Sequence, residues 1–409
     1  MHSAEPIGIV ELGDINIKCL IFKINENNAE ILSTSITPSD GFHNDIVINL
    51  PKATSAIRSC ISNAEKKAEI SLKKINVVFE QPDFLCTNFS KHKKIDGSKI
   101  HKDDIDFLLK DAKKQLLLND KKQSIIHIFN YNYTVDGKTF VEEPIGVYAD
   151  SLTHEMTFIA APKNNLKNIN QIFINCDIEI ERLFSRTFTL GAELLNQNDL
   201  EFGSILLDFG FEKTSFGLFK NFALIHSTTF PIGVNHITKD ISKVCSLHME
   251  ESENIKNNID FSFQNNQTLF DENGYLKNTF FINSSFRKIS KNLILNVVKA
   301  RFNEIIDKIK KQLTEPGIKI ASGKNFLISG DGSKLPNIEK YFTNLFGSNI
   351  KKTKISGEKN KEDLEINFSS CLGALKIIKD GWETEAIPEK SDKNNEKISF
   401  FAKIFKINN

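Results

Sequence analysis

The chain has 409 residues, a formal net charge of +1 at pH 7, 40% apolar residues and 26% charged residues. This length exceeds what one hydrophobic core usually organises, so we expect at least two domains. The nearly neutral charge argues against a nucleic-acid-binding protein, because such proteins ordinarily carry a strongly basic face.

Cysteine usage and hydropathy indicate the compartment. The six cysteines, at positions 19, 60, 86, 176, 245 and 371, lie far apart without a Cys-x-x-Cys pair. That spacing is typical of free thiols in a reducing cytosol. The chain does not open with a basic and then an apolar segment, and no apolar run reaches the ~18 residues of a membrane helix. We therefore expect a cytosolic protein that is neither exported nor membrane-spanning.

The first 162 residues predict an α/β unit followed by an insertion. Residues 7–36 read as two strands around a glycine turn and then a third strand. A helix follows, because Ala53, Ile57, Ile61 and Ala64 recur at spacings of four and three. After a strand at 75–80, residues 80–162 predict an inserted α+β subdomain. We expect it to contain a polar loop, a helix at 102–118, and strands at 124–135 and 154–162.

The strand-turn-strand pattern restarts at residue 204, with a third strand at 221–230. A mostly helical region is expected at 236–313, interrupted by a polar stretch. Residues 324–346 read as strand, glycine turn and helix, and residues 367–378 as a last helix that begins with small residues. The segment after Asp380 is polar and predicts a flexible linker.

The restart is a duplication. "GIVELGDINIKCLIFKIN" (8–25) and "SILLDFGFEKTSFGLFKN" (204–221) align without a gap at an offset of 197 positions, so that 8–24 fall on 205–221, Glu11 on Asp208 and Gly13 on Gly210. A hairpin turn that carries glycine can aim backbone N–H groups at phosphate, since no Cβ intervenes. An acid before such a turn suits a Mg²⁺ shell or the orientation of water. A single such turn is more often only a hairpin turn.

These motifs resemble the actin-like ATPase superfamily and, within it, the FtsA family of bacterial cell-division proteins. The correspondence includes "VELGDINIK" and "LDFGFEKTSF" as phosphate loops, "LISGDGSKLPNI" as the adenosine motif, "SSCLGAL" as the last helix start, and "GVNHITKDIS" and "SENIK". It covers nearly the whole chain. It implies two duplicated actin-like, ribonuclease H-like domains: subdomain 1A at 7–79 and 163–202, an inserted SHS2-like subdomain 1C at 80–162, 2A at 203–235 and 318–380, and 2B at 236–317.

The resemblance implies binding of ATP with Mg²⁺. The implied nucleotide-binding residues are Glu11, Gly13, Lys18, Asp208, Gly210, Thr214, Glu253, Lys256, Gly330 and Gly332, and Asp208 is the implied metal residue, through water. Several positions depart from the family pattern. Asp14 stands where phosphate would approach, Phe211 and Glu212 replace glycines, Ser215 replaces an acid, and Asp331 replaces a glycine. No catalytic residue is therefore assigned, and we expect at most a weak ATPase, with a nucleotide-free form as the alternative.

The last residues, 395–409, predict an amphipathic helix after a linker at 381–394. At 100° per residue one half of the helical wheel is apolar and the other carries lysines. The apolar side consists of Ile398, Phe400, Phe401, Ile404, Phe405 and Ile407, and the polar side includes Lys403 and Lys406. Such a helix lies in the surface of a bilayer, with its lysines toward anionic headgroups. A helix docked on its own domain is the alternative.

The combined interpretation is a peripheral protein on the cytoplasmic face of the inner membrane, which forms protofilaments and recruits the tubulin-like FtsZ and later division proteins. The resemblance implies that the FtsZ C-terminal peptide binds near Arg301 and Glu304, one helical turn apart. An intrahelical ion pair is the simpler role for these two residues. Two rivals remain: a pilus-assembly actin homologue resembling PilM, and an actin-fold kinase. The terminal helix argues against the first, and the altered phosphate loops argue against the second.

Overall fold

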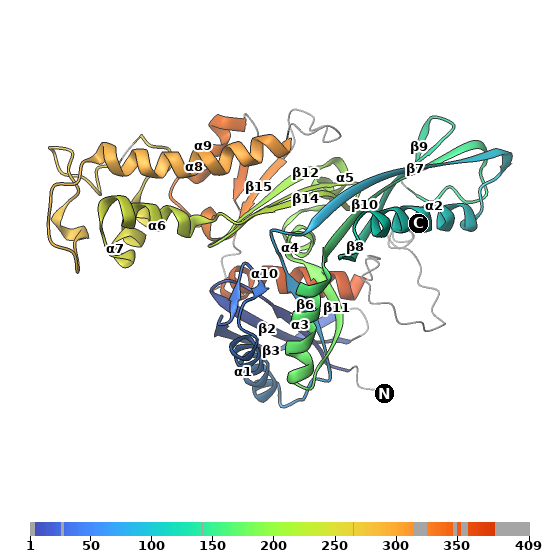
Figure 1. Cartoon of the computed structure of the whole chain (residues 1–409), viewed down its shortest axis with the longest axis horizontal. Coiled ribbons are helices and arrows are strands. Elements are labelled where there is room, and N and C mark those ends of the chain that lie inside the picture. Colours follow the sequence, from blue (N-terminus) through green and yellow to red (C-terminus); the bar gives the residue numbers. More distant parts are fainter. Residues whose placement is uncertain are drawn as a thin grey trace. The chain divides into compact units, whose positions relative to one another are not determined.

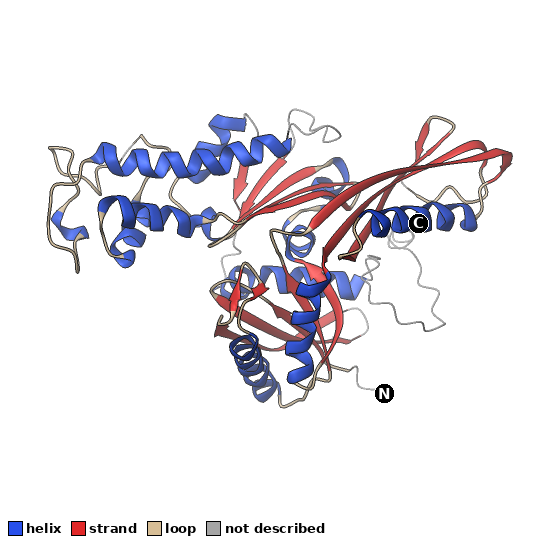
Figure 2. Cartoon of the chain, in the orientation of Figure 1, coloured by secondary structure: helices blue, strands red, loops and turns tan. Residues whose placement is uncertain are grey.

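The computed structural model describes residues 5–25, 28–140, 142–264, 266–313, 325–346, 350–352 and 359–380. Figure 1 traces the chain, and Figure 2 separates its helices from its strands. The described residues form two compact units. Unit 1 contains those within 5–203, 217–228 and 359–380, and unit 2 contains those within 204–216 and 229–352.

Unit 1 is built on a five-stranded sheet in the order β11-β6-β1-β2-β3. The strands are β1 Ile7–Glu11, β2 Asn16–Asn25, β3 Asn28–Pro38, β6 Lys74–Phe79 and β11 Glu179–Ser185. β1 runs antiparallel to β2 and parallel to β6, which is parallel to β11. The carboxyl ends of β1, β6 and β11 therefore meet at one edge, where open α/β sheets ordinarily bind ligands.

Helices cover both faces of this sheet. α1, Leu50–Ala68, and α3, Lys163–Asn175, lie together against one face, and α4, Arg186–Leu194, pairs with α10, Lys359–Asp380, on the other. α1 buries Ala53, Ile57, Ile61 and Ala64, as the four-and-three spacing predicts. The Asn49 side chain accepts from the Lys52 N–H at 3.1 Å and starts the helix.

The last helix differs from its prediction. The sequence assigned residues 318–380 to subdomain 2A, but α10 packs against α4, β1 and β2 of unit 1. The helix also starts before the predicted residue 367. Phe368 has non-helical angles, φ −120° and ψ 18°, so a second helical segment begins at the small residues Ser369 and Ser370. The small-residue signal marked this kink and not the start of the helix.

The insertion is a four-stranded antiparallel sheet, β7-β10-β8-β9, with α2 alongside. Its elements are β7 Leu85–Lys99, α2 Lys102–Asn119, β8 Gln123–Val135, β9 Lys138–Phe140 and β10 Tyr148–Pro162. The predicted polar loop is wrong, because β7 occupies that segment. β7 is an edge strand, where lysines are common, and its Lys91 and Lys93 pair with Asp111 and Asp104 of α2.

The second five-stranded sheet has the order β14-β13-β12-β15-β16. Its strands are β12 Ser204–Phe209, β13 Thr214–Lys220, β14 Ala223–Phe230, β15 Asn325–Ser329 and β16 Ile350–Lys352. β12 is parallel to β15, so Asp208 pairs in register with Ser329. The predicted repeat of three strands is confirmed.

The helices of unit 2 are α6 Val234–Cys245, α7 Met249–Asn258, α8 Lys291–Leu313 and α9 Ile338–Phe346, with 3₁₀ turns η1 Asn278–Phe280 and η2 Asp331–Lys334. The predicted helical region and the strand, turn and helix that follow are therefore present. The remaining short elements, in unit 1, are β4 Phe42–His43, β5 Ile46–Val47 and α5 Gln197–Phe202.

Candidate functional site

The acid that ends β1 is buried and fully engaged. Glu11 is 1% exposed, and Lys18 Nζ on β2 lies 3.2–3.3 Å from both of its carboxylate oxygens. Arg186, the first residue of α4, pairs with the same carboxylate, and Ser370 Oγ donates to Oε2 at 2.5 Å. Burial raises the pKa of Glu11, but the charges of Lys18 and Arg186 lower it by more than burial raises it. The pKa therefore lies below its usual value. The sequence reasoning found Glu11 and Lys18 but missed Arg186.

A second buried acid lies at the same sheet edge. Glu80 follows β6, is 1% exposed, and accepts from the Thr187 N–H at 2.9 Å and from Ser185 Oγ at 2.8 Å. It therefore caps the amino end of α4, where a carboxylate is stabilised by the helix dipole. An acid directly after a buried strand was the sequence signal for this residue, and the prediction did not use it.

The two duplicated glycines have the same local surroundings. A Cβ on Gly13 would lie 2.6 Å from the Asn16 carbonyl oxygen, and a Cβ on Gly210 would lie 2.9 Å from that of Lys213. Both contacts are with the carbonyl three residues ahead, so the offset of 197 preserves the turn in detail. The close approach of this carbonyl is enough to explain why each hairpin has glycine. The repeated glycines are therefore not by themselves evidence of a phosphate-binding site.

In unit 2 the altered second loop is tied to α6. Glu212 accepts from Asn235 Nδ2 at 2.6 Å and from Lys239 Nζ at 2.9 Å. The Val234 and Asn235 N–H groups donate to the carbonyls of Gly210 and Phe211. Burial raises the pKa of Glu212, and hydrogen bonds from Lys239 and Asn235 lower it to below its usual value. The carboxylate that replaces a glycine thus holds the first turn of α6.

Two polar residues of the next strand are also engaged internally. Thr214, a predicted nucleotide contact, is fully buried and donates to the Ile232 carbonyl at 2.6 Å. Ser215, which replaces a family acid, is 2% exposed and accepts from Thr229 Oγ1 at 3.1 Å. Both hydroxyls therefore fasten β13 to the segment that leads into α6.

The third glycine turn, at Gly330 and Gly332, packs against Asp208 and Phe209 of the same unit. Gly330 has φ +78°, and a Cβ there would lie 2.6 Å from Asp208 Oδ1. A Cβ on Gly332 would lie 2.0 Å from Phe209 Cδ1. The flat surface that Gly332 packs against in the structure is the ring of Phe209. Asp331, in place of a glycine, pairs with Lys334 at 2.9 Å.

The Glu-x-x-Lys motif of α7 forms a closed pair. Lys256 Nζ lies 2.7–2.8 Å from both carboxylate oxygens of Glu253, and Thr238 Oγ1 of α6 donates to Oε2 at 2.6 Å. Lys256 is 2% exposed and Glu253 is 39% exposed. The predicted pair is brought together, with the acid as its accessible member.

Arg301 has a partner that the sequence did not reveal. It pairs with Glu304 at 2.5 Å, as the spacing predicts. Its Nε and Nη2 also bind the two oxygens of Asp240 on α6, at 2.6 and 3.1 Å. Hydrogen bonding to Asp240 raises the pKa of Arg301 above its usual value. Arg301 therefore joins two helices, and the expected intrahelical pair with Glu304 is one part of a larger ion-pair cluster.

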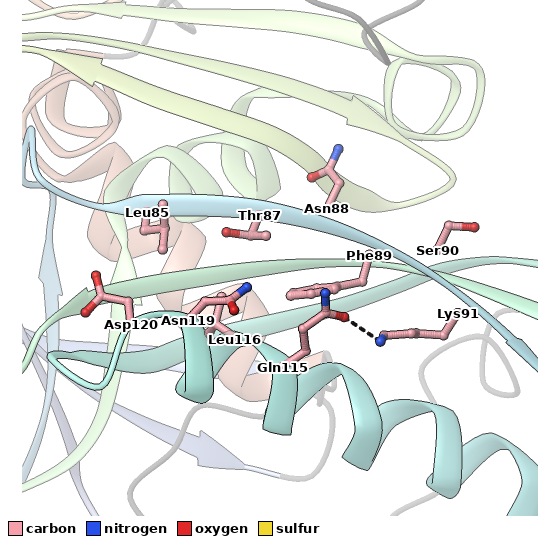
Figure 3. Close-up of a pocket in the computed structure, with 10 residues that line it drawn as sticks. All are labelled: Leu85, Thr87, Asn88, Phe89, Ser90, Lys91, Gln115, Leu116, Asn119 and Asp120. Carbon is pink, nitrogen blue, oxygen red and sulfur yellow. Dashed lines mark hydrogen bonds between the residues drawn. The ribbon is translucent and has the colours of Figure 1, made fainter.

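A cavity of about 380 Å³ lies in the inserted subdomain, between β7 and α2. Figure 3 shows Phe89 and Leu116 in its wall, with Gln115 accepting from Lys91 at 2.5 Å. None of the predicted site residues lines it.

The described residues contain neither a metal-binding cluster nor a membrane-spanning helix. Among the described residues, no group of three or more His, Cys, Asp and Glu side chains is placed to hold a metal ion. Within the same residues, no helix is long and apolar enough to cross a membrane. The predicted linker at 381–394 and helix at 395–409, with all eight membrane-binding residues, lie outside the described residues.

The chain is similar to known proteins in sequence and in fold. A family model described as "Cell division protein FtsA" matches residues 205–373, and one described as "SHS2 domain inserted in FTSA" matches residues 84–160. The FtsA of Buchnera aphidicola subsp. Acyrthosiphon pisum is 23% identical over 98% of this chain and 96% of its own length. The FtsA of Agrobacterium fabrum is 19% identical over 84% of this chain and 80% of its own length.

Two solved structures show the fold. A PilM-PilN type IV pilus biogenesis complex has a TM-score of 0.63 at 12% identity, over 91% of this chain and 98% of that chain. MreB 5 of Spiroplasma citri bound to AMPPNP has a TM-score of 0.51 at 13% identity, over 92% and 98%. At these identities the structures support the actin-like fold only, whereas the family models and relatives agree on one family. The chain therefore belongs to the FtsA family of cell division proteins, with an actin-like α/β fold and an inserted SHS2 domain.

Proposed function

We propose that this FtsA-family protein tethers the FtsZ ring to the cytoplasmic face of the inner membrane at the division site. The observation that carries the proposal is the amphipathic pattern of residues 395–409, with Phe401 and Phe405 on one side and Lys403 and Lys406 on the other. Family membership supplies the cell-division context. The chain's work is then bridging, and it depends on a membrane surface, on FtsZ, on later division proteins and on self-association into protofilaments.

The four-subdomain division remains part of this proposal, with α10 moved to subdomain 1A. In this scheme the inserted subdomain, 80–162, is the platform for later division proteins. The terminal helix is attached through residues 381–394, which directly follow α10. A bridging protein with this order carries its membrane anchor at the end of subdomain 1A and its FtsZ surface on α8.

The proposed surface for the FtsZ peptide includes Arg301 and Glu304. Arg301 is 24% exposed, so an incoming carboxylate can reach it. The Nε and Nη2 atoms of Arg301 already bind the carboxylate of Asp240. A carboxylate of the peptide therefore has to displace Asp240, or it has to bind at Nη1 beside Glu304. Peptide binding through Arg301 is accordingly linked to the contact between α6 and α8.

We also propose that the protein binds ATP or ADP, as MreB 5 binds AMPPNP. Lys18 is partly exposed beside the Gly13 turn and suits phosphate, and the accessible carboxylate of Glu253 suits ribose hydroxyls. Gly210 remains a candidate phosphate contact, but Thr214 fits poorly because its hydroxyl is used inside the fold. Gly330 and Gly332 pack on Asp208 and Phe209. These features support binding more than hydrolysis, so turnover is expected to be slow.

A three-component experiment tests the tethering proposal. Vesicles with anionic lipids are sedimented with FtsZ from the same organism, with and without the full chain. FtsZ should pellet with the vesicles only when the chain is present. The chain ending at residue 394 should still bind FtsZ in solution but leave it in the supernatant. If FtsZ pellets equally with both chains, the membrane link lies elsewhere.

A further inference from the structure

Two positive side chains, Lys18 and Arg186, surround the single negative charge of Glu11. Glu11 comes from β1, Lys18 from β2 and Arg186 from α4, and their side chains are 1%, 19% and 20% exposed. The carboxylate is enclosed, while both cations remain partly accessible. In the register of the sheet, Glu11 and Lys18 are directly paired and flank the turn that contains Gly13. The cations therefore lie at the base of this turn, at the carboxyl ends of β1 and β11.

This arrangement does not suit the Mg²⁺ shell for which an acid before a glycine turn is a general candidate. Both of its oxygens already accept from Lys18, and they also accept from Arg186 or Ser370. A divalent cation beside Glu11 would lie close to two positive side chains. Like charges at such short range repel one another strongly in a partly buried site. The donor set at Glu11 therefore does not fit Mg²⁺.

We propose that Lys18 and Arg186 together take the place of a divalent cation, and that this chain binds nucleotide phosphates independently of Mg²⁺. The inference rests on the nucleotide-binding part of the proposed function. Arginine suits the role because its planar guanidinium presents five donors and matches phosphate oxygens in pairs. Glu11 then acts as a positioning residue: its negative charge holds both cations at the turn and offsets the repulsion between them.

Asp208 is the competing possibility, since it is the predicted metal residue of unit 2. If Mg²⁺ joins the nucleotide through Asp208, affinity will depend on the metal whatever Arg186 does. If Arg186 and Lys18 supply the charge, removal of the metal will change affinity little. The two possibilities therefore differ in one measurable quantity, the ratio of the ATP affinities with and without Mg²⁺.

The experiment is calorimetric titration of the full chain with ATP, in excess Mg²⁺ and in excess EDTA. The two dissociation constants of the parent chain should differ by less than about tenfold. Arg186→Ser should weaken binding in EDTA by about tenfold or more, and Arg186→Lys should recover part of the loss. Glu11→Asp combined with Arg186→Ser frees a shorter carboxylate from the guanidinium, and this variant should bind ATP more tightly in Mg²⁺ than in EDTA.

Thermal unfolding of each variant shows whether it is folded at the titration temperature. Parent affinity that rises more than about tenfold with Mg²⁺ overturns the inference. So does an Arg186→Ser variant that is folded and binds ATP as the parent does, because Arg186 is then only structural. If the parent chain gives no binding heat in Mg²⁺ and none in EDTA, both this inference and the nucleotide proposal are overturned. A metal-dependent parent chain overturns the inference alone.

Discussion

The guanidinium of Arg301 on α8 and the carboxylate of Asp240 on α6 form a bidentate pair, with Nε and Nη2 at 2.6 and 3.1 Å from its two oxygens. Arg301→Gln should lower the free energy of unfolding by about 1 to 3 kcal/mol, since it leaves a partly buried carboxylate without its charged donor. Urea denaturation gives the value. Lys308→Gln, two turns along the same helix, is the matched control and should change it by less than ~0.5 kcal/mol.

The same pair makes a prediction about the FtsZ peptide. Asp240→Asn should leave Arg301 in place but release its bidentate face, so the affinity for the peptide should rise or stay the same. Arg301→Glu should abolish binding. Fluorescence anisotropy with a labelled FtsZ C-terminal peptide measures both. Equal, unchanged affinities in the two variants would move the peptide surface away from α8.

Glu251 on α7 is held by a cluster of N–H donors. Its Oε1 accepts from the backbone of Ile282, Asn283 and Ser284 at 2.7–2.8 Å. Burial raises the pKa of Glu251, but the hydrogen bonds lower it from 4.5 to about 2. Since the folded pKa lies below the unfolded one, the carboxylate adds stability above pH 4.5 and loses it as the pH falls toward about 2.

Glu251→Gln should therefore destabilise the protein by about 1 to 3 kcal/mol at neutral pH. The difference from the parent should shrink as the pH is lowered through this window. Thermal unfolding at a series of pH values measures the difference, and Glu250→Gln, on the exposed side of the same turn, is the control. A difference that stays constant with pH would contradict the assigned hydrogen bonds.

Sequence reasoning succeeded where the determining contacts are local. The hairpins around Gly13 and Gly210 and the buried face of α1 follow from patterns within about twenty residues, and all three are present. The missed features depend on partners far apart in the chain. Arg186 reaches Glu11 across 175 positions, and Asp240 reaches Arg301 across 61. No periodicity or motif in one sequence reports such pairs.

The missed strand β7 illustrates the same limit. Its sequence contains four lysines from Leu85 to Lys99 and reads as polar. It is a strand because β10 pairs with it along most of its length and because α2 supplies acids to Lys91 and Lys93. Composition alone cannot distinguish such an edge strand from a loop.

The duplicated glycines predict matched effects. Gly13→Ala and Gly210→Ala each place a Cβ within 3 Å of a carbonyl oxygen three residues ahead. Each should lower the free energy of unfolding by about 1 to 3 kcal/mol, because the turn has to open. Ile15→Ala, an exposed side chain in the first turn, is the control. Urea denaturation without nucleotide gives the values, and a loss at one glycine alone would contradict the shared turn geometry.

Glu212 predicts a loss of stability in unit 2. Glu212→Gln removes the charge that Lys239 and the amino end of α6 both contact. The free energy of unfolding should fall by about 1 kcal/mol at low salt and by less at high salt, since the pair is partly exposed and screened. Denaturation at two ionic strengths measures this, and a salt-independent loss would point to packing instead.

The central claim is tested most directly by the binding of the full chain to vesicles that contain anionic lipids. The account predicts that the parent chain co-sediments, that Phe401→Glu and Phe405→Glu each abolish sedimentation, and that Lys403→Gln weakens it in a salt-dependent way. The matched control is Phe107→Glu, an exposed aromatic on α2, which should sediment as the parent does. Sedimentation of the Phe401→Glu and Phe405→Glu variants at the parent's level would contradict the tether.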